Sequence, residues 1–375
     1  MKIFQSHYNQ GQWSPELPQS SDAQWVITFG CRIKARDAAF QQQILSSFSQ
    51  AEIVGCTTSG EIYDNQVFDN TIVLTAVTFE ETTIEVGSAL VNDFPDSYAA
   101  GKGLAAAIPS QGLKYVFVLS DGQKINGTDL VKGLSESLPT NVLISGGLAG
   151  DDARFEETLV WHNEQVKSGL LVICGFYGDK IRFGHGTLGG WDTFGPERKI
   201  TRSEGNVLYE LDEQPALELY KSYLGDFSKD LPSSALLFPL SLQAPDQSES
   251  VVRTILNIDE QEQSMTFAGD IPQNYTAKLM KANFERLIDG ASGAAENAMS
   301  SLNSRADLAI LISCVGRRLV LKQRVDEELE SVEEALSDNC VKCGFYSYGE
   351  LSPLINSKGC HLHNQTMTIT TLSED

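Results

Sequence analysis

The sequence predicts a mixed α+β fold in which repeated strand–helix–strand units form mixed sheets, arranged as two pseudo-symmetric halves. A short apolar strand, an amphipathic helix and a second strand that runs into a Gly-rich loop follow one another three times along the chain. Further strand patterns separate the units, so strands outnumber what an alternating βαβ fold would need. A length of 375 residues is sufficient for two domains with buried cores.

The first unit is expected over about residues 25–91. It opens with the apolar strand 25–30, and a helix follows at about 35–49 because apolar residues recur there at helical spacing. A second strand, 52–56, leads into the loop sequence TTSGE. Two long strands complete the unit, 71–79 and 82–91.

The second and third units have the same layout. In the second, at about 114–188, a helix is expected near 128–138 with Thr128 as its candidate N-cap, and the strand 141–145 then enters the loop GGLAGDD. The third unit begins with the strand 307–316. Its later elements are expected at 324–337 (helix), 341–351 (strand) and 364–372 (strand).

Two loops indicate an internal duplication. Gly55 and Gly60 are five residues apart, as are Gly344 and Gly349, and the second glycine of each pair precedes a glutamate. Such spacing is typical of a repeated supersecondary unit. The stretch 190–206 has no clear periodicity, so we place the boundary near it. The expected domains are an N-terminal one at 1–205 and a C-terminal one at 206–375. Ligand pockets commonly lie between such halves.

Composition excludes several classes of partner. Lys plus Arg number 28 against 50 Asp plus Glu, a net charge of −22, so phosphate backbones and anionic lipids should be repelled. No apolar run approaches the roughly 18 residues of a membrane helix, and the N-terminus has no apolar signal core. Seven thinly spread cysteines do not suggest a disulfide framework. We therefore expect a cytoplasmic protein without nucleic-acid or membrane partners.

Two histidines are candidates for facing an apolar interior. Strand alternation places His185 on one face with Ile181 and Phe183, and it places His363 with Met367 if the last strand reaches that far. A neutral imidazole in an apolar cleft is one way to hold haem iron. The alternative is a core histidine whose hydrogen bonds are satisfied within the protein.

A second group of candidate residues could bind the polar ends of a small ligand. The Gly-acid loops that follow strands offer backbone N–H groups and carboxylates for a carboxylate or an ammonium group. Their candidate residues are Gly60, Glu61, Gly147, Asp151 and Glu350. Arg198 and Arg202 could hold carboxylates or propionates, or could form ion pairs with nearby acids.

Other motifs carry less weight. GHGTLG (184–189) fits a dinucleotide-loop pattern, but the following GWDTFGP cannot begin a helix cleanly. Cys340 and Cys343 are spaced like zinc ligands, but the second half of such a site lacks the usual spacing. We find no nucleophile–base constellation, so the protein is not expected to be an enzyme, although an enzyme built on the duplicated Gly-acid loops stays an alternative.

Eight segments in order also resemble the FIST domain family (F-box and intracellular signal transduction proteins), with an N-terminal FIST part followed by a C-terminal one. The segments are VGCTTSGEI, LSDGQKINGTDLVKGL, ISGGLAGDDARFE, GHGTLGGWDTFGPERKITRSEGNVLYELD, TFAGDIP, LISCVGRRLVL, GFYSYGELSP and CHLHNQTMTIT. The resemblance implies a signal-input protein that binds a small ligand. Free-standing bacterial members are similar to NosP-type nitric-oxide-sensing haem proteins.

Three alternatives stay open, of which the resemblance implies the first two. The first is a haem b protein that senses nitric oxide through His185 or His363 and regulates a partner histidine kinase, in a two-component system, or a cyclic-di-GMP enzyme. The second is a haem-free sensor of an amino acid or related metabolite. The third is the enzyme already mentioned. No C-x-x-C-H motif is present, so any haem would be bound non-covalently.

Overall fold

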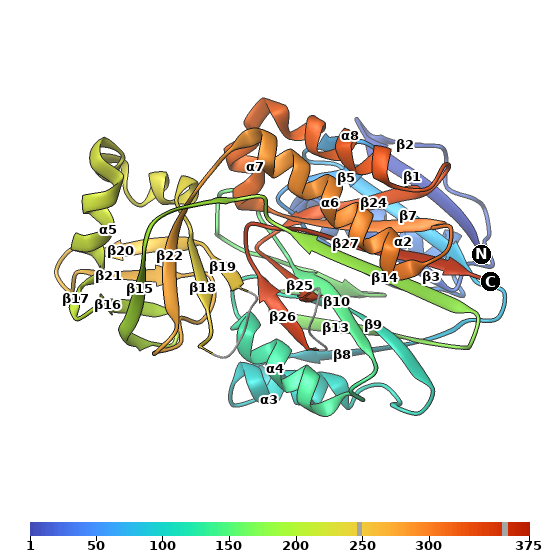
Figure 1. Cartoon of the computed structure of the whole chain (residues 1–375). Helices are drawn as coiled ribbons and strands as arrows, with labels where there is room; N and C mark the ends of the chain where they lie inside the picture. Colours follow the sequence, from blue (N-terminus) through green and yellow to red (C-terminus); the bar gives the residue numbers. More distant parts are fainter. Residues whose placement is uncertain (246–249, 355–358) are drawn as a thin grey trace.

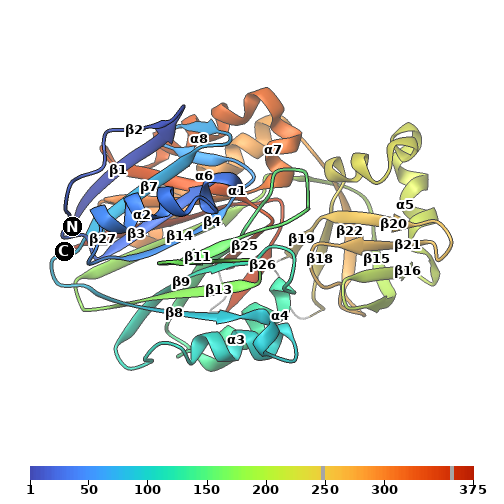
Figure 2. The same ribbon diagram turned by 180° about the vertical axis from the view of Figure 1, so that it is seen from behind.

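The structure is a computed structural model that describes residues 1–245, 250–354 and 359–375. Over these residues the strands form four sheets. Three sheets build a core to which both termini belong, and the fourth forms a lobe inserted at residues 192–281, which projects from one end (Figure 1). The two termini lie together at the opposite end of the core (Figure 2).

The first core sheet has seven strands. Its parallel central pair is β3 and β4, and β7 pairs antiparallel with β3. The order is β12 (Gln165–Lys167), β11 (Val160–His162), β4 (Glu52–Thr57), β3 (Trp25–Gly30), β7 (Ile72–Thr78), β1 (Lys2–Asn9) and β2 (Gln12–Ser14).

The second and third core sheets repeat this arrangement with six strands each. Their parallel pairs are β9–β10 and β23–β24, and β13 and β27 take the place of β7. The second order is β26 (Cys360–His363), β25 (Gly349–Pro353), β10 (Leu143–Leu148), β9 (Leu113–Ser120), β13 (Leu170–Tyr177) and β8 (Thr83–Leu90). The third order is β14 (Ile181–Leu188), β27 (Met367–Glu374), β23 (Leu308–Cys314), β24 (Val341–Ser347), β5 (Glu61–Tyr63) and β6 (Gln66–Phe68).

Each unit gives a hairpin to a neighbouring sheet. The hairpin β5–β6 of the first unit pairs with β24, β11–β12 of the second pairs with β4, and β25–β26 of the third pairs with β10. Three backbone hydrogen bonds join the three units in the same cyclic order. They run from Gly150 N to Thr57 O (2.9 Å), from Tyr348 N to Leu148 O (3.2 Å) and from Ser59 N to Tyr346 O (2.8 Å). The three sheets are therefore interlocked in a cycle.

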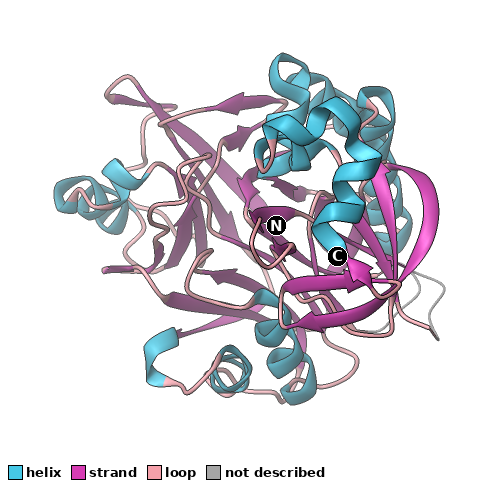
Figure 3. Ribbon diagram, turned by 90° about the vertical axis from the view of Figure 1, so that its left-hand side faces the viewer, coloured by secondary structure: helices cyan, strands magenta, loops and turns pink. Residues whose placement is uncertain are grey.

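The main hydrophobic core fills the space that the three sheets enclose. Alternate residues such as Trp25, Phe117 and Ile310 point into it, while their neighbours point outward to the helices. The strands of the parallel pairs are covered on both faces, which explains why they read as continuous apolar runs. In Figure 3 helices lie at the left, upper right and bottom of the view, and strands fill the middle and the right-hand edge.

The helices cover the outer faces of the sheets. Packing joins α2 to the first sheet, α3 and α4 to the second, and α6 and α8 to the third. The core helices are α1 (Arg32–Ala35), α2 (Ala38–Ser47), α3 (Ser97–Ala105), α4 (Gly127–Ser137), α6 (Phe284–Leu302), α7 (Val315–Leu321) and α8 (Val325–Ala335). Among the described residues, no helix has the length and apolarity needed to cross a membrane.

Glycines allow the parallel strands to approach each other. A Cβ at Gly344 would lie 1.8 Å from the carbonyl oxygen of Leu311 on the neighbouring strand. Gly55 and Gly146 hold the corresponding positions in the other two sheets, with 2.0 Å and 1.9 Å to the facing carbonyl. Any side chain there would push the paired strands apart.

The inserted lobe is an eight-stranded sheet with its own core. Its order is β19 (Ser250–Arg253), β18 (Leu240–Gln243), β22 (Thr276–Lys281), β15 (Asp192–Glu204), β16 (Val207–Leu211), β21 (Ser264–Phe267) and β20 (Ile255–Asp259), with β17 (Gln214–Pro215) paired to β16. The helix α5 (Ala216–Leu224) and the short helix η3 (Ser233–Leu237) pack on it.

The predicted fold class is confirmed: the chain is mixed α+β with mixed sheets. The sheets nevertheless group the chain differently from the predicted halves 1–205 and 206–375. Residue 205 lies in the turn between β15 and β16, inside the lobe, and the chain after 281 returns to the core. The long helix α6 was not expected from the sequence pattern.

Candidate functional site

Two cavities, each of about 610 Å³, lie where the core meets the inserted lobe. The first, which we call the His363 cavity, lies between the end of β14, the start of α6 and the lobe strands β19 and β22. The second, the Lys124 cavity, lies between the loop after β9, the start of α7 and the lobe strands β20 and β21. Ligand sites are commonly found at such domain interfaces.

The Lys124 cavity is built from segments that are distant in the sequence. The core supplies the loop 122–127, which runs from β9 into α4, and the segment 314–316, which joins β23 to α7. Asn126 caps α4 by accepting hydrogen bonds from the backbone N–H groups of Thr128 and Asp129. The lobe supplies Thr254 and the segment 267–269 at the end of β21.

Two buried polar atoms in this wall have no hydrogen-bond partner among the described residues. They are the hydroxyl of Thr254, which is 5% exposed, and the side-chain oxygen of Asn364, which is 1% exposed. The amide nitrogen of Asn364 already donates to the carbonyl of His363 at 3.0 Å, so the oxygen is free to accept. Buried polar groups normally have partners, so both atoms keep an unused capacity for a hydrogen bond at this wall.

An aromatic pair and a lysine complete the wall. The rings of Phe155 and Tyr348 are stacked with centroids 4.6 Å apart, and Phe155 is 49% exposed. The lysine is Lys124, in the loop after β9.

Cys314 also lines the cavity, but burial raises the pKa of its thiol. The described lining contains no His, Asp or Glu that could act as a base for that thiol. The wall is therefore suited to binding rather than to nucleophilic catalysis.

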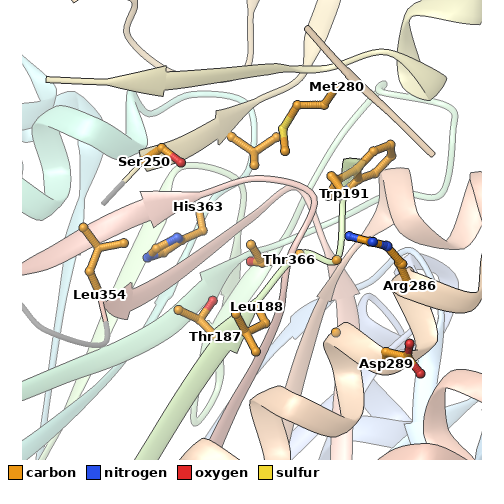
Figure 4. Close-up of a pocket in the computed structure, with 14 residues that line it drawn as sticks. Thr187, Leu188, Trp191, Ser250, Met280, Arg286, Asp289, Leu354, His363 and Thr366 are labelled. Carbon is orange, nitrogen blue, oxygen red and sulfur yellow. The ribbon is translucent and has the colours of Figure 1, made fainter. Parts of the chain in front are cut away.

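The His363 cavity holds one of the predicted histidines. Figure 4 shows the His363 ring beside Leu354 on one side, with Trp191 and Arg286 on the opposite side. The ring Nε2 lies 3.0 Å from the carbonyl oxygen of Ser352, so Nε2 carries the proton and Nδ1 keeps its lone pair. Burial lowers the pKa of His363 to about 3, so the ring is neutral at physiological pH.

The turn 363–366 separates the two cavities. His363 and Thr366 line the first cavity, and Asn364 lines the second. The side-chain amide of Gln365 is fully buried and has no hydrogen-bond partner among the described residues, while its carbonyl accepts from Trp191 Nε1 at 2.8 Å. The turn therefore contacts both cavities.

The other predicted histidine and the two arginines lie away from both cavities. His185 lies on β14 beneath α6, with Nδ1 3.4 Å from the hydroxyl of Ser301. Arg198 pairs with Asp212 at 3.1 Å, and Arg202 pairs with Glu210 at 3.0 Å. Both arginines belong to the inserted lobe and hold its strands together.

The predicted loop acids are buried within their own loops. Glu61 accepts hydrogen bonds from Thr58 (2.7 Å) and Thr71 (2.8 Å), and Glu350 accepts the equivalent bonds from Ser347 (2.7 Å) and Thr366 (2.9 Å). Burial raises the pKa of Glu61 to about 7 and that of Glu350 to about 8. These acids stabilise loops and do not line either cavity.

The remaining predicted residues also shape the backbone. Asp151 is 1% exposed and accepts two hydrogen bonds from Arg154, at 3.0 and 2.8 Å. Gly60 has a φ of +131°, and a Cβ there would meet the guanidinium of Arg318 at 2.6 Å. Gly147 packs on Ile312, at 2.8 Å from the position of a Cβ.

Sequence reasoning missed the residues that define the Lys124 cavity. Lys124 and Asn364 lie inside the quoted segments LSDGQKINGTDLVKGL and CHLHNQTMTIT, but neither has a pattern that marks it as a binding residue. Thr254 lies outside every quoted segment, and nothing in the local sequence indicates its role. Among the described residues, no group of three or more His, Cys, Asp or Glu could hold a metal ion.

Two family models match this chain. A model of the FIST N domain matches residues 24–214, and a model of the FIST C domain matches residues 216–353. The chain is 27% identical over 270 residues to an uncharacterized protein of Methanocaldococcus jannaschii, covering 62% of this chain and 49% of that protein. It is 22% identical over 249 residues to an uncharacterized protein of Mycobacterium bovis, covering 64% and 63%.

The matches span about half to two thirds of the length of these curated relatives. Among solved structures, a cyanuric acid hydrolase from A. caulinodans aligns over 99% of this chain and 98% of its own. The identity is 8% and the TM-score is 0.35, so this likeness carries no argument about function.

Proposed function

The chain belongs to the FIST family, whose domains are generally sensory domains of signalling proteins, and on that premise we propose that it senses a small metabolite bound in the Lys124 cavity. The observation that carries the proposal is how this cavity is built. Apart from Leu236, Thr254 and Leu256, every lining residue comes from the sequence segments that carry the family resemblance. Seven of the eight segments contribute, although they are spread over the whole chain.

The position of the cavity supports a signalling role. The lobe contacts the core through Arg253, which donates to the carbonyl of Leu362 at 3.0 Å, and through Asp270, which accepts from Asn126 at 2.8 Å. A ligand that touches both parts would favour one relative position of lobe and core, because it binds that arrangement more tightly. The partner that reads this change is proposed to be a histidine kinase or a cyclic-di-GMP enzyme.

A thermal-shift screen with a filled-cavity variant tests the ligand site. Metabolites that bind should stabilise the folded protein, by about 2.7 kcal/mol at a hundredfold excess over the Kd. Ala268→Trp places a bulky side chain at the half-buried cavity wall and should abolish that shift. The control Gln261→Trp adds the same side chain at an exposed hairpin and should retain it. Equal shifts in all three proteins, or no shift with any metabolite, would contradict the proposal.

Haem sensing of nitric oxide stays a second candidate because His363 fits an iron ligand chemically. The ring is neutral, its Nε2–H is held by a backbone carbonyl, and Nδ1 keeps its lone pair, which is the usual arrangement of a metal-binding histidine. Arg286 lines the same cavity and could pair with a propionate. Bound haem would supply the iron that takes up nitric oxide.

Two single variants test the haem candidate. His363→Ala should abolish a stoichiometric Soret band in haem titrations, because His363 lines a cavity. His185→Ala should leave the band unchanged, because His185 packs under α6. Absorption spectra of the ferric, ferrous and nitric-oxide forms provide the measurement. No Soret band in the unaltered protein after titration would rule the candidate out.

A further inference from the structure

We infer that the ligand of the Lys124 cavity is a small carboxylate that carries an N–H or O–H donor on a flat, apolar body. This inference rests on the proposed function, since it assigns the chemistry of the same site. Three properties of the wall lead to it: its charge, its unpartnered polar atoms and its aromatic surface.

The charge of the wall favours an anion. The chain has 50 acidic residues, and composition alone would place about three among the 21 residues that line this cavity. The described lining has none, and its one charged side chain is Lys124. No ion pair joins Lys124 to another described residue. The nearby carboxylate of Asp270 is bonded by Asn126 and does not line the cavity.

The backbone around Lys124 adds to the positive field. α4 has 11 residues and begins at Gly127, which lines the cavity, so the positive end of its dipole lies at this wall. The backbone N–H of Lys124 donates to Asp121 at 2.7 Å, which fixes the loop that carries the lysine. A lysine on a fixed loop, with no acid among the other residues of the described lining, is suited to a carboxylate.

The unpartnered atoms favour a hydrogen-bond donor on the ligand. The side-chain oxygen of Asn364 can only accept, since its amide nitrogen is already bonded to the His363 carbonyl. The hydroxyl of Thr254 can donate or accept, and it approaches from the lobe rather than the core. One N–H or O–H group on the ligand would satisfy Asn364, and so remove the cost of a buried unpaired oxygen.

The rest of the wall is apolar and partly flat. Phe155 and Tyr348 stack at 18° between ring planes, and Phe155 and Leu256 are 49% and 46% exposed. Leu148 and Phe267 add apolar surface. A planar body against the aromatic pair would cover exposed apolar area and gain stacking energy. The wall therefore fits a ring that carries the two polar groups.

The test uses three carboxylates of this class as probes: 4-hydroxyphenylacetate, indole-3-acetate and anthranilate. At least one should bind, with the Kd measured by calorimetry. Tyramine has the ring, hydroxyl and first methylene of 4-hydroxyphenylacetate with an aminomethyl cation in place of the carboxylate, and it should bind at least about tenfold more weakly. Lys124→Met should weaken the carboxylate by about tenfold or more, and should remove the preference over tyramine. The control Lys167→Met changes the net charge equally on an exposed strand and should leave the Kd unchanged.

A second variant tests the hydroxyl that the lobe contributes. Thr254→Val removes a hydroxyl that has no partner among the described residues, so folding should be unaffected while the Kd of 4-hydroxyphenylacetate rises. Failure of all three carboxylates at about 10 mM, or equal binding of tyramine, overturns the inference. If a neutral or cationic metabolite instead stabilises the protein and Ala268→Trp abolishes the shift, the proposed function stands and only the ligand class fails. If no metabolite stabilises the protein, both fail.

Discussion

Replacing Glu328 by glutamine is expected to lower the free energy of unfolding by about 3–5 kcal/mol, because it leaves the buried charge of Arg317 without its counter-ion. Both side chains are 0% exposed, and Arg317 Nε donates to Glu328 at 2.7 Å. The Tyr346 hydroxyl donates to the other carboxylate oxygen at 2.7 Å. Arg317 also donates to the carbonyl of Leu287, so the guanidinium holds α6 against the third sheet.

The neighbouring residue provides a matched control. Glu327 lies on the same helix, α8, and pairs with Arg324 at 2.6 Å. Unlike the buried pair, these two side chains are exposed to solvent, by 46% for Glu327 and 34% for Arg324. Glu327→Gln should therefore cost less than about 1 kcal/mol. Urea unfolding at pH 7 measures both variants. Similar losses of free energy in the two variants would show that burial does not increase the contribution of the Arg317–Glu328 pair to stability.

Glu350→Gln is expected to flatten the dependence of stability on pH. Burial raises the pKa of Glu350 from 4.5 to about 8 in the folded protein, so the carboxyl keeps its proton there while the unfolded chain loses it. Between these two pH values the folded state binds more protons than the unfolded state. Stability due to this group is therefore complete below about pH 4.5 and falls as the pH rises toward 8, by up to about 1.4 kcal/mol per pH unit.

Glutamine mimics the protonated acid and does not titrate. The free energy of unfolding of the variant should therefore rise relative to that of the unaltered protein as the pH rises. Free energies of unfolding at pH 5.5, 6.5 and 7.5 would show the two curves diverging. Glu61→Gln should show the same effect over a narrower range, since burial raises the pKa of Glu61 to about 7. Glu85→Gln, on an exposed part of β8, should leave the slope unchanged. Parallel curves for Glu350→Gln would contradict the expectation.

The local elements of the fold could be predicted because they follow local patterns. The helix expected at 128–138 is α4 (Gly127–Ser137), and the one expected at 324–337 contains α8 (Val325–Ala335). Periodicity determines such elements within a few residues, although α4 is capped by Asn126 and not by the expected Thr128. It does not specify which sheet a strand joins. The hairpin β5–β6 belongs to the first unit in sequence and to the third sheet in space, so no local signal could place it.

The candidate site was harder to predict than the fold. The sequence indicated Glu61 and Glu350 because an acid that follows a glycine in a loop can bind the polar end of a ligand. In the structure, hydrogen bonds from nearby residues of the protein occupy both carboxylates. Thr254 and Asn364 look ordinary in the sequence. Their interest comes from buried atoms without partners, a property that depends on how lobe and core meet. His363 is buried, but not for the expected reason: it ends β26, whereas Met367 begins β27 in another sheet, so the two residues do not share one strand.

The cyclic exchange of hairpins has a consequence for how the core can come apart. Without its borrowed hairpin, each parallel pair would expose a free edge along β4, β10 or β24. Unpaired edges of this kind attract other chains. A single unit expressed alone is therefore not expected to fold stably. The three units are expected to unfold together in one cooperative transition. Over the residues that the structure describes, the inserted lobe pairs its strands only within itself, so it is the part that can open without breaking the ring.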